Sequence, residues 1–121
     1  MVDDDKFLLS MYESKFKRYG HEVLSINSGS GAIDKIKEGF IPDIIILDII
    51  MPPPDGLQTL EIIRKENLAP DAVVIMLTNQ GDSKEIEKAK SLNIDGYIVK
   101  AALIPSEVAL EVIKIAESKK S

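Results

Sequence analysis

The stretch Asp43-Ile44-Ile45-Ile46-Leu47-Asp48 decides the fold. A short, continuous run of branched aliphatic residues is typical of a strand that is buried on both faces of a parallel sheet. Asp48 ends this run, and the proline-rich stretch 51–54 that follows can continue neither a helix nor a central strand. The sequence therefore places the Asp48 carboxylate at the carboxyl end of a strand, beside a fixed loop. Ligands gather at that edge in open α/β sheets.

A carboxylate in this position can coordinate a cation or act as a nucleophile. It can equally accept a hydrogen bond from a loop amide and have no chemical role. The stretch around Asp48 does not by itself decide between these interpretations, so the other strand ends have to be compared with it.

The size and composition of the chain narrow the class of protein. Its 121 residues suit one hydrophobic core, so we expect a single domain over residues 1–121. The formal net charge of −5 argues against direct binding of nucleic acid, which needs a basic face. The absence of cysteine excludes disulfides and thiolate metal sites. No apolar run is long enough to span a bilayer and no signal peptide opens the chain, so we expect a cytoplasmic protein without membrane insertion.

Short aliphatic runs alternate with amphipathic segments, which indicates an α/β domain with a parallel sheet. Strand patterns cover residues 21–26, 43–47, 72–78 and 96–100. Apolar residues at helical spacing predict helices over residues 6–19 and 30–38, from a cap at Asp55 to residue 63, from a cap at Asp82 or Ser83 to Leu92, and from Pro105 onward.

Polar residues stand where four segments leave the predicted sheet: Asp3-Asp4-Asp5, Asp48, Thr78 and Lys100. Because parallel strands end at one edge, these side chains can converge on one site. Clustered carboxylates suit Mg²⁺, and one carboxylate can form an aspartyl phosphate. A hydroxyl and an ammonium can hold phosphoryl oxygens. Each residue alone has a structural interpretation, but their occurrence at four successive sheet exits favours a functional site.

With these residues the chain resembles a response regulator receiver domain of two-component signalling, the CheY-like family, from Val2 to Lys120. The resemblance rests on Val2-Asp3-Asp4-Asp5, Leu47-Asp48-Ile49-Ile50-Met51-Pro52 with Asp55-Gly56, Met76-Leu77-Thr78, and Gly96-Tyr97-Ile98-Val99-Lys100. It implies a flavodoxin-like, doubly wound α/β fold, in which helices flank a parallel five-stranded sheet of order 2-1-3-4-5.

The resemblance also implies the chemistry of the site. Asp48 would accept a phosphoryl group from a histidine kinase or a phosphotransfer protein. Asp3, Asp4, Asp48 and the backbone carbonyl of Ile50 would bind Mg²⁺. The domain would transfer and lose its phosphoryl group autocatalytically, unlike a conventional turnover enzyme.

A switch is implied by the same resemblance. Thr78 would bond the phosphoryl group and move toward it, and Lys100 would pair with it. Tyr97 would turn inward as Thr78 moves, which is a plausible bistable element. The surface around residues 82–115 would then bind a downstream protein.

The N-terminus departs from the family pattern, because only Met1 and Val2 precede the acidic cluster where the family has a full central strand. A strand normally needs about five residues, so we expect an unusually short or missing first strand. The sheet would then be weakened there or completed by another chain, for example in a homodimer. A misassigned start codon would explain the short segment equally well.

Three further departures lie around the site. Ala101 follows Lys100 where the family usually has a cis proline, and we expect a trans bond because a cis bond here costs about 2.5–4 kcal/mol. Asn79 stands where a small residue is usual and would narrow access to the phosphoryl site. Pro54 would only stiffen its loop.

The leading functional hypothesis is a stand-alone receiver without an output domain. The alternative is a phosphorylation-independent pseudo-receiver that acts as an interaction or dimerisation module. A hydrolase with an aspartyl nucleophile is disfavoured, because such enzymes resembling haloacid dehalogenases need a second Asp two residues after the nucleophile, and Ile50 occupies that position.

Overall fold

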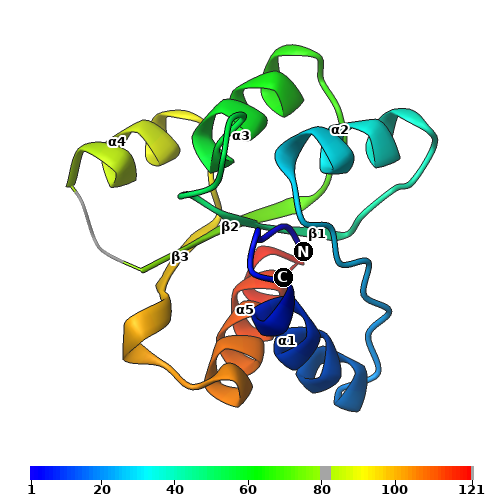
Figure 1. The fold of residues 1–121 in the computed structure, drawn as a ribbon, viewed down its shortest axis with the longest axis vertical. Coiled ribbons are helices and arrows are strands. Elements are labelled where there is room, and N and C mark those ends of the chain that lie inside the picture. The colour runs from blue at the N-terminus through cyan, green and yellow to red at the C-terminus, as the bar shows by residue number, and fades with distance from the viewer. Residues whose placement is uncertain (80–82, 121) are drawn as a thin grey trace.

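The computed structural model describes residues 1–79 and 83–120 (Figure 1). Within these residues a parallel sheet has the strand order β1-β2-β3, with bounds Ile44–Asp48, Val73–Thr78 and Gly96–Val99. The helices are α1 (Lys6–Arg18), α2 (Gly29–Lys37), α3 (Gly56–Lys65), α4 (Ser83–Ser91) and α5 (Pro105–Lys120), with a short 3₁₀ helix, η1 (Lys100–Ala102). In the described part of the chain no helix is long and apolar enough to cross a membrane.

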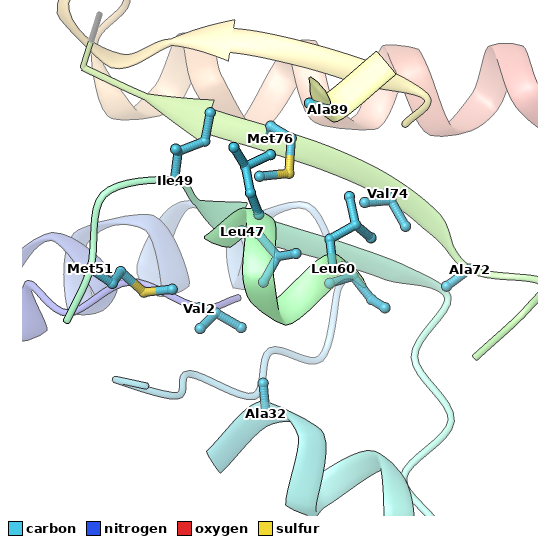
Figure 2. Packing of buried hydrophobic residues seen from close by; sticks show 12 residues of the cluster. Val2, Ala32, Leu47, Ile49, Met51, Leu60, Ala72, Val74, Met76 and Ala89 are labelled. Atoms are coloured by element: carbon cyan, nitrogen blue, oxygen red, sulfur yellow. The ribbon is translucent and has the colours of Figure 1, made fainter. Parts of the chain in front are cut away.

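The sheet lies between two layers of helices. Figure 1 shows α1 and α5 on one face and α2, α3 and α4 on the other. Every residue of the central strand β2 is buried, which explains why residues 72–77 are a continuous apolar run. Alternate residues of β1 pack into different helix layers. Ile45 and Leu47 belong to the cluster on the α2 and α3 side, in which Figure 2 shows Leu47, and Ile46 belongs to the cluster on the α1 and α5 side.

The helix ends follow the local signals in the sequence. Asp5 caps α1 and accepts hydrogen bonds from the N–H groups of Phe7 and Leu8. Gly20, with φ +83°, ends the turn after this helix, as expected. Asp55 and Gln58 form a reciprocal capping box at the start of α3. The expected cap at Asp82 lies outside the described residues.

The first strand is reduced to a bridge at Val2. The Val2 N–H donates to the Ile46 carbonyl at 2.8 Å, and the Val2 carbonyl accepts from the Asp48 N–H at 2.9 Å. On its other side Val2 pairs with Ile26, so Val2 lies between residue 26 and β1, as the order 2-1-3-4-5 requires. The prediction of a short or missing first strand is confirmed.

The predicted five-stranded sheet is therefore found only in part, since the described residues form three strands and two isolated bridges. The prediction of a strand over residues 21–26 is wrong in this structure, where only Ile26 joins a bridge. A strand forms only where its backbone can hydrogen-bond to a neighbouring strand. Here the backbone hydrogen bonds of Ile26 go to Met1 and Asp3, which are too few residues to pair with a whole strand.

The last strand also ends earlier than expected. β3 stops at Val99, and Lys100 begins the helix η1. The Lys100–Ala101 peptide bond is not among the cis bonds of the described residues, in agreement with the expectation from Ala101; the cis bond found is Pro53–Pro54.

Candidate functional site

Three carboxylates meet at the carboxyl end of the sheet. Asp48 ends β1, and the bridge between Val2 and Leu47 brings Asp3 and Asp4 beside it. One carboxylate oxygen from each of the three aspartates lies within 4.8 Å of the others. Asp3 and Asp48 are buried, with 1% and 4% of their surface exposed, whereas Asp4 is open to solvent. The predicted convergence of these residues is confirmed.

Lys100 enters the same cluster from the end of β3. Its ammonium Nζ lies 2.6 Å from Oδ2 of Asp3 and 3.3 Å from Oδ2 of Asp48. The other oxygen of Asp3, Oδ1, accepts a hydrogen bond from the Asp5 N–H at 2.9 Å. Asp3 is thus held on both oxygens, which fixes its carboxylate in the pocket.

The charges in this pocket change the affinity of its groups for protons. Burial and the neighbouring Asp3 charge raise the pKa of Asp48 to about 6, although the Lys100 ammonium opposes the shift. Burial lowers the pKa of Lys100, but its hydrogen bond to Asp3 and the charges of Asp48 and Asp3 outweigh burial, so the net shift is upward. Lys100 therefore stays protonated, and Asp48 takes up a proton more easily than an ordinary aspartate.

Thr78 and Tyr97 lie on the adjoining strands. Thr78 ends β2, is fully buried, and pairs in register with Val99, next to Lys100. Tyr97 is half-buried and packs against the apolar cluster on the α2 and α3 side of the sheet. The side chain of Ile50 is 58% exposed in the loop after β1. The metal-binding role predicted for its carbonyl is untested.

Two features of the site were not predicted. Tyr12 of α1 is buried; burial and the charges of Asp3, Asp48 and Asp5 raise its pKa, although Lys100 opposes the shift. Its helical spacing marked it only as a core residue, so the sequence held no signal for this proximity.

Gly56 packs so closely on the loop that a Cβ there would lie 2.1 Å from the Asp48 carbonyl oxygen. The Asp55-Gly56 pair was a signal for this contact.

The donor set fits a hard divalent cation. Three carboxylates within reach of one another provide oxygen ligands, which Mg²⁺ prefers, and exposed Asp4 leaves room for the waters that Mg²⁺ keeps. Lys100 places a cation 3.3 Å from Asp48, as stabilisation of a transferred phosphoryl group requires, and the buried Thr78 ends the adjacent strand. This acidic cluster is typical of the Mg²⁺ site of receiver domains.

Comparison with protein families matches residues 1–109 to the response regulator receiver domain. A probable transcriptional regulator, ycf27, of Guillardia theta is 33% identical over 100 residues, which cover 83% of this chain. The match spans 38% of that relative, so the chain corresponds to well under half of the longer protein.

Solved structures agree with the fold. A DNA-binding response regulator of the LuxR family from Staphylococcus aureus has a TM-score of 0.81 at 30% identity, with 95% of each chain covered. A CheY-like receiver domain protein from Methanospirillum hungatei has a TM-score of 0.86 at 23% identity, with 98% of this chain and 92% of that chain covered. Together with the family match, these findings show that the chain belongs to the response regulator receiver domains of two-component signalling.

Proposed function

We propose that this chain accepts a phosphoryl group on Asp48 from the phosphohistidine of a histidine kinase or a phosphotransfer protein. The position of Asp48 carries the proposal, because its buried carboxylate faces two further aspartates and a lysine ammonium at the ligand-binding edge of the sheet. Membership of the receiver family makes a kinase the expected partner.

The residues divide the work of the transfer. A carboxylate oxygen of Asp48 forms the new O–P bond as the N–P bond to the donor histidine breaks, and the histidine nitrogen keeps the electron pair and takes up a proton. The Lys100 ammonium, already 3.3 Å from Asp48, offsets the charge of the incoming phosphoryl oxygens. Thr78 is buried at the end of the adjacent strand, and its hydroxyl would form a further contact with the phosphoryl group.

Mg²⁺ is the proposed cofactor. Asp3, Asp4 and Asp48 would hold it, with the Ile50 carbonyl as a fourth protein ligand. When bound, the ion neutralises charge that develops on the phosphoryl oxygens. Asp3 also holds Lys100 at 2.6 Å, so one carboxylate would serve both cations of the site.

We propose that phosphorylation of Asp48 changes the surface formed by residues 82–115. Thr78 pairs in register with Val99, which lies two residues after Tyr97 and directly before Lys100, so a movement of Thr78 would reach both residues through one pair of strands. The surface of residues 82–115 that would change includes α4, β3, η1 and the first turns of α5. We propose that this receiver domain docks a downstream protein through this surface.

Incubation with acetyl phosphate and Mg²⁺, followed by intact-mass measurement, tests the proposal. We expect an adduct of about 80 Da, the mass of one phosphoryl group, on the unchanged chain and none on Asp48→Asn. Asp55→Asn is the matched control, since Asn caps α3 as well as Asp does and Asp55 lies outside the carboxylate cluster. A chain that takes no phosphate while its fold is intact would instead be a pseudo-receiver acting through constitutive contacts.

A further inference from the structure

The guanidinium of Arg64 binds the chain at the end of the neighbouring helix. α3 and α4 lie side by side on one face of the sheet, and Arg64 is in the last turn of α3 (Figure 1). Its Nε donates to the Leu92 carbonyl at 3.0 Å, and its Nη2 donates to the Asn93 carbonyl at 2.9 Å. Two donors in one planar fork hold two successive carbonyls in a fixed geometry, which a flexible ammonium cannot do. Arg64 therefore fixes the chain directly after α4.

The same stretch is also bound to the sheet and to the last helix. The Asp95 N–H donates to the Val74 carbonyl of β2 at 2.7 Å, and the Asp95 carboxylate accepts from the Val74 N–H at 2.8 Å. The Lys119 ammonium of α5 pairs with the same carboxylate. Residues 92–95, which we call the α4–β3 turn, are thus connected to α3, β2 and α5.

The two halves of α4 differ in how deeply they are buried. Ala89 is fully buried in the apolar cluster on the α2 and α3 side, and Leu92 packs against that cluster. Among residues 84–87 none is buried. The pair of Lys88 with Glu61 is exposed to solvent and contributes little. Apolar packing therefore holds the C-terminal half of α4 more strongly than its N-terminal half.

The helix α3 joins the α4–β3 turn to the candidate site. At its start, the Gly56 N–H donates to the Ile49 carbonyl at 2.9 Å, and a Cβ on Gly56 would lie 2.1 Å from the Asp48 carbonyl oxygen. At its end, Arg64 holds the α4–β3 turn. A regular helix is a rigid element, so α3 ties this turn to the backbone that carries the Asp48 carboxylate.

We propose that the α4–β3 turn is a fixed pivot of α4 and that Arg64 is the positioning residue that fixes it. The N-terminal half of α4, which follows the carboxyl end of β2, opens and moves about this turn while the turn stays bound to α3. For the response to phosphate, the inference rests on the phosphorylation proposed for Asp48. That response of α4 is then confined to residues 83–88.

Amide hydrogen exchange followed by NMR tests the anchor without phosphate. Arg64→Met keeps the apolar stem but has no donors, and Lys65→Met is the matched control, because Lys65 is an exposed cation in the same turn of α3. We expect Arg64→Met to speed exchange of the Leu92 and Asp95 amides by about ten-fold and Lys65→Met to leave it unchanged. Circular dichroism checks that both variants are folded. Equal exchange at these amides in the two variants would overturn the role of Arg64.

Arg64→Lys separates the planar fork from the positive charge. A lysine keeps the charge beside the end of α4 but cannot bind both carbonyls in one fixed geometry. We expect exchange at Leu92 and Asp95 close to that of Arg64→Met. Exchange as slow as in the unchanged chain would show that charge alone holds the turn, and would refute the fork as the anchor.

The two ends of α4 in the unchanged chain test the pivot itself. An unanchored helix frays at both ends, whereas a pivot at the α4–β3 turn should make the Glu87 amide exchange at least about ten-fold faster than the Leu92 amide, each relative to its intrinsic rate. Equal protection of these two amides would overturn the pivot.

Beryllofluoride with Mg²⁺, an analogue of the bound phosphoryl group, provides the last measurement. We expect it to change exchange at Glu87 and to leave Leu92 and Asp95 as they were, whereas in Arg64→Met the change should extend to both. A response at Leu92 as large as that at Glu87 in the unchanged chain would contradict the pivot. A chain that does not bind the analogue would disprove the phosphate uptake at Asp48, and the exchange measured without the analogue then decides whether the pivot exists.

Discussion

The ammonium of Lys100 lies 2.6 Å from a carboxylate oxygen of Asp3, although 97 positions of sequence separate the two residues. Both side chains are buried, with 7% and 1% of their surface exposed. The contact joins the N-terminal segment to the end of β3 across the intervening strands, and it neutralises part of a pocket that holds three carboxylates. The ratio of negative to positive charge in this pocket therefore affects both the stability of the protein and the affinity of the pocket for cations.

Lys100→Ala should destabilise the protein at neutral pH. The variant leaves Asp3 and Asp48 buried together without a counter-charge, and loss of one partner of a buried pair costs about 3–5 kcal/mol. Urea unfolding at pH 7 measures the loss, and added Mg²⁺ should recover part of it. Lys88→Ala is the control, because the pair of Lys88 with Glu61 is exposed and should contribute little. Equal effects of the two substitutions would show that the pocket tolerates its charges without Lys100.

Asp48→Asn should stabilise the protein at neutral pH. The pKa of Asp48 is raised to about 6 in the folded state, so its contribution to stability is fully present below its ordinary value near 3.8 and is lost as the pH rises through 6. Replacement by a neutral amide removes a penalty on the order of 2 kcal/mol at pH 7. The gain should vanish below about pH 4, where the carboxyl group is protonated in both states.

Unfolding curves of Asp48→Asn at pH 7 and pH 4 check this sign. Asp34→Asn, on the exposed surface of α2, serves as the control and should leave the free energy of unfolding nearly unchanged at both values. A stabilisation of Asp48→Asn that is the same at both pH values would refute the electrostatic cause.

Much of the site was predictable because it depends on one strong rule. The run from Ile44 to Leu47 marks a buried parallel strand, and strands of that kind end at a common edge. Asp48 and Lys100 follow such runs, so their convergence could be predicted before any coordinates were known. Their roles in phosphoryl transfer are proposals that rest on the family and on this geometry.

Other features depend on tertiary contacts that no local pattern encodes. Residues 21–26 alternate like a strand, but pairing requires a neighbour, and only Ile26 finds one. The choice of Asp3 as the nearest partner of Lys100 follows from the register of Val2 against Leu47, which two residues of sequence cannot specify. The proximity of Tyr12 to the pocket likewise comes from the packing of α1 on the sheet.

Asp4→Asn should weaken Mg²⁺ binding by roughly ten-fold or more, since it removes one charged oxygen ligand from the set of three. Asp5→Asn is a close control: Asp5 caps α1, a task that Asn performs equally well, and its carboxylate is not part of the cluster. Calorimetric titration of Mg²⁺ into the two variants measures the difference. Similar losses in both would mean that the ion responds to the general negative charge of the N-terminus and has no specific ligand in Asp4.

Gly56→Ala should destabilise the protein and distort the loop after β1. A Cβ at this position would lie 2.1 Å from the Asp48 carbonyl oxygen and 2.8 Å from the Ile49 Cα, and neither backbone atom can turn away as a side chain can. Overpacking of this kind costs about 1–3 kcal/mol or more, and here the displaced backbone carries the carboxylate of the site. Gly31→Ala in α2 is the matched control, because its new Cβ meets the movable Ile26 and Ser28 side chains and an alanine favours the helix. Thermal unfolding together with Mg²⁺ titration should show lower stability and weaker binding for Gly56→Ala alone. A Gly56→Ala variant as stable as Gly31→Ala, with unchanged Mg²⁺ affinity, would show that this close contact does not position Asp48.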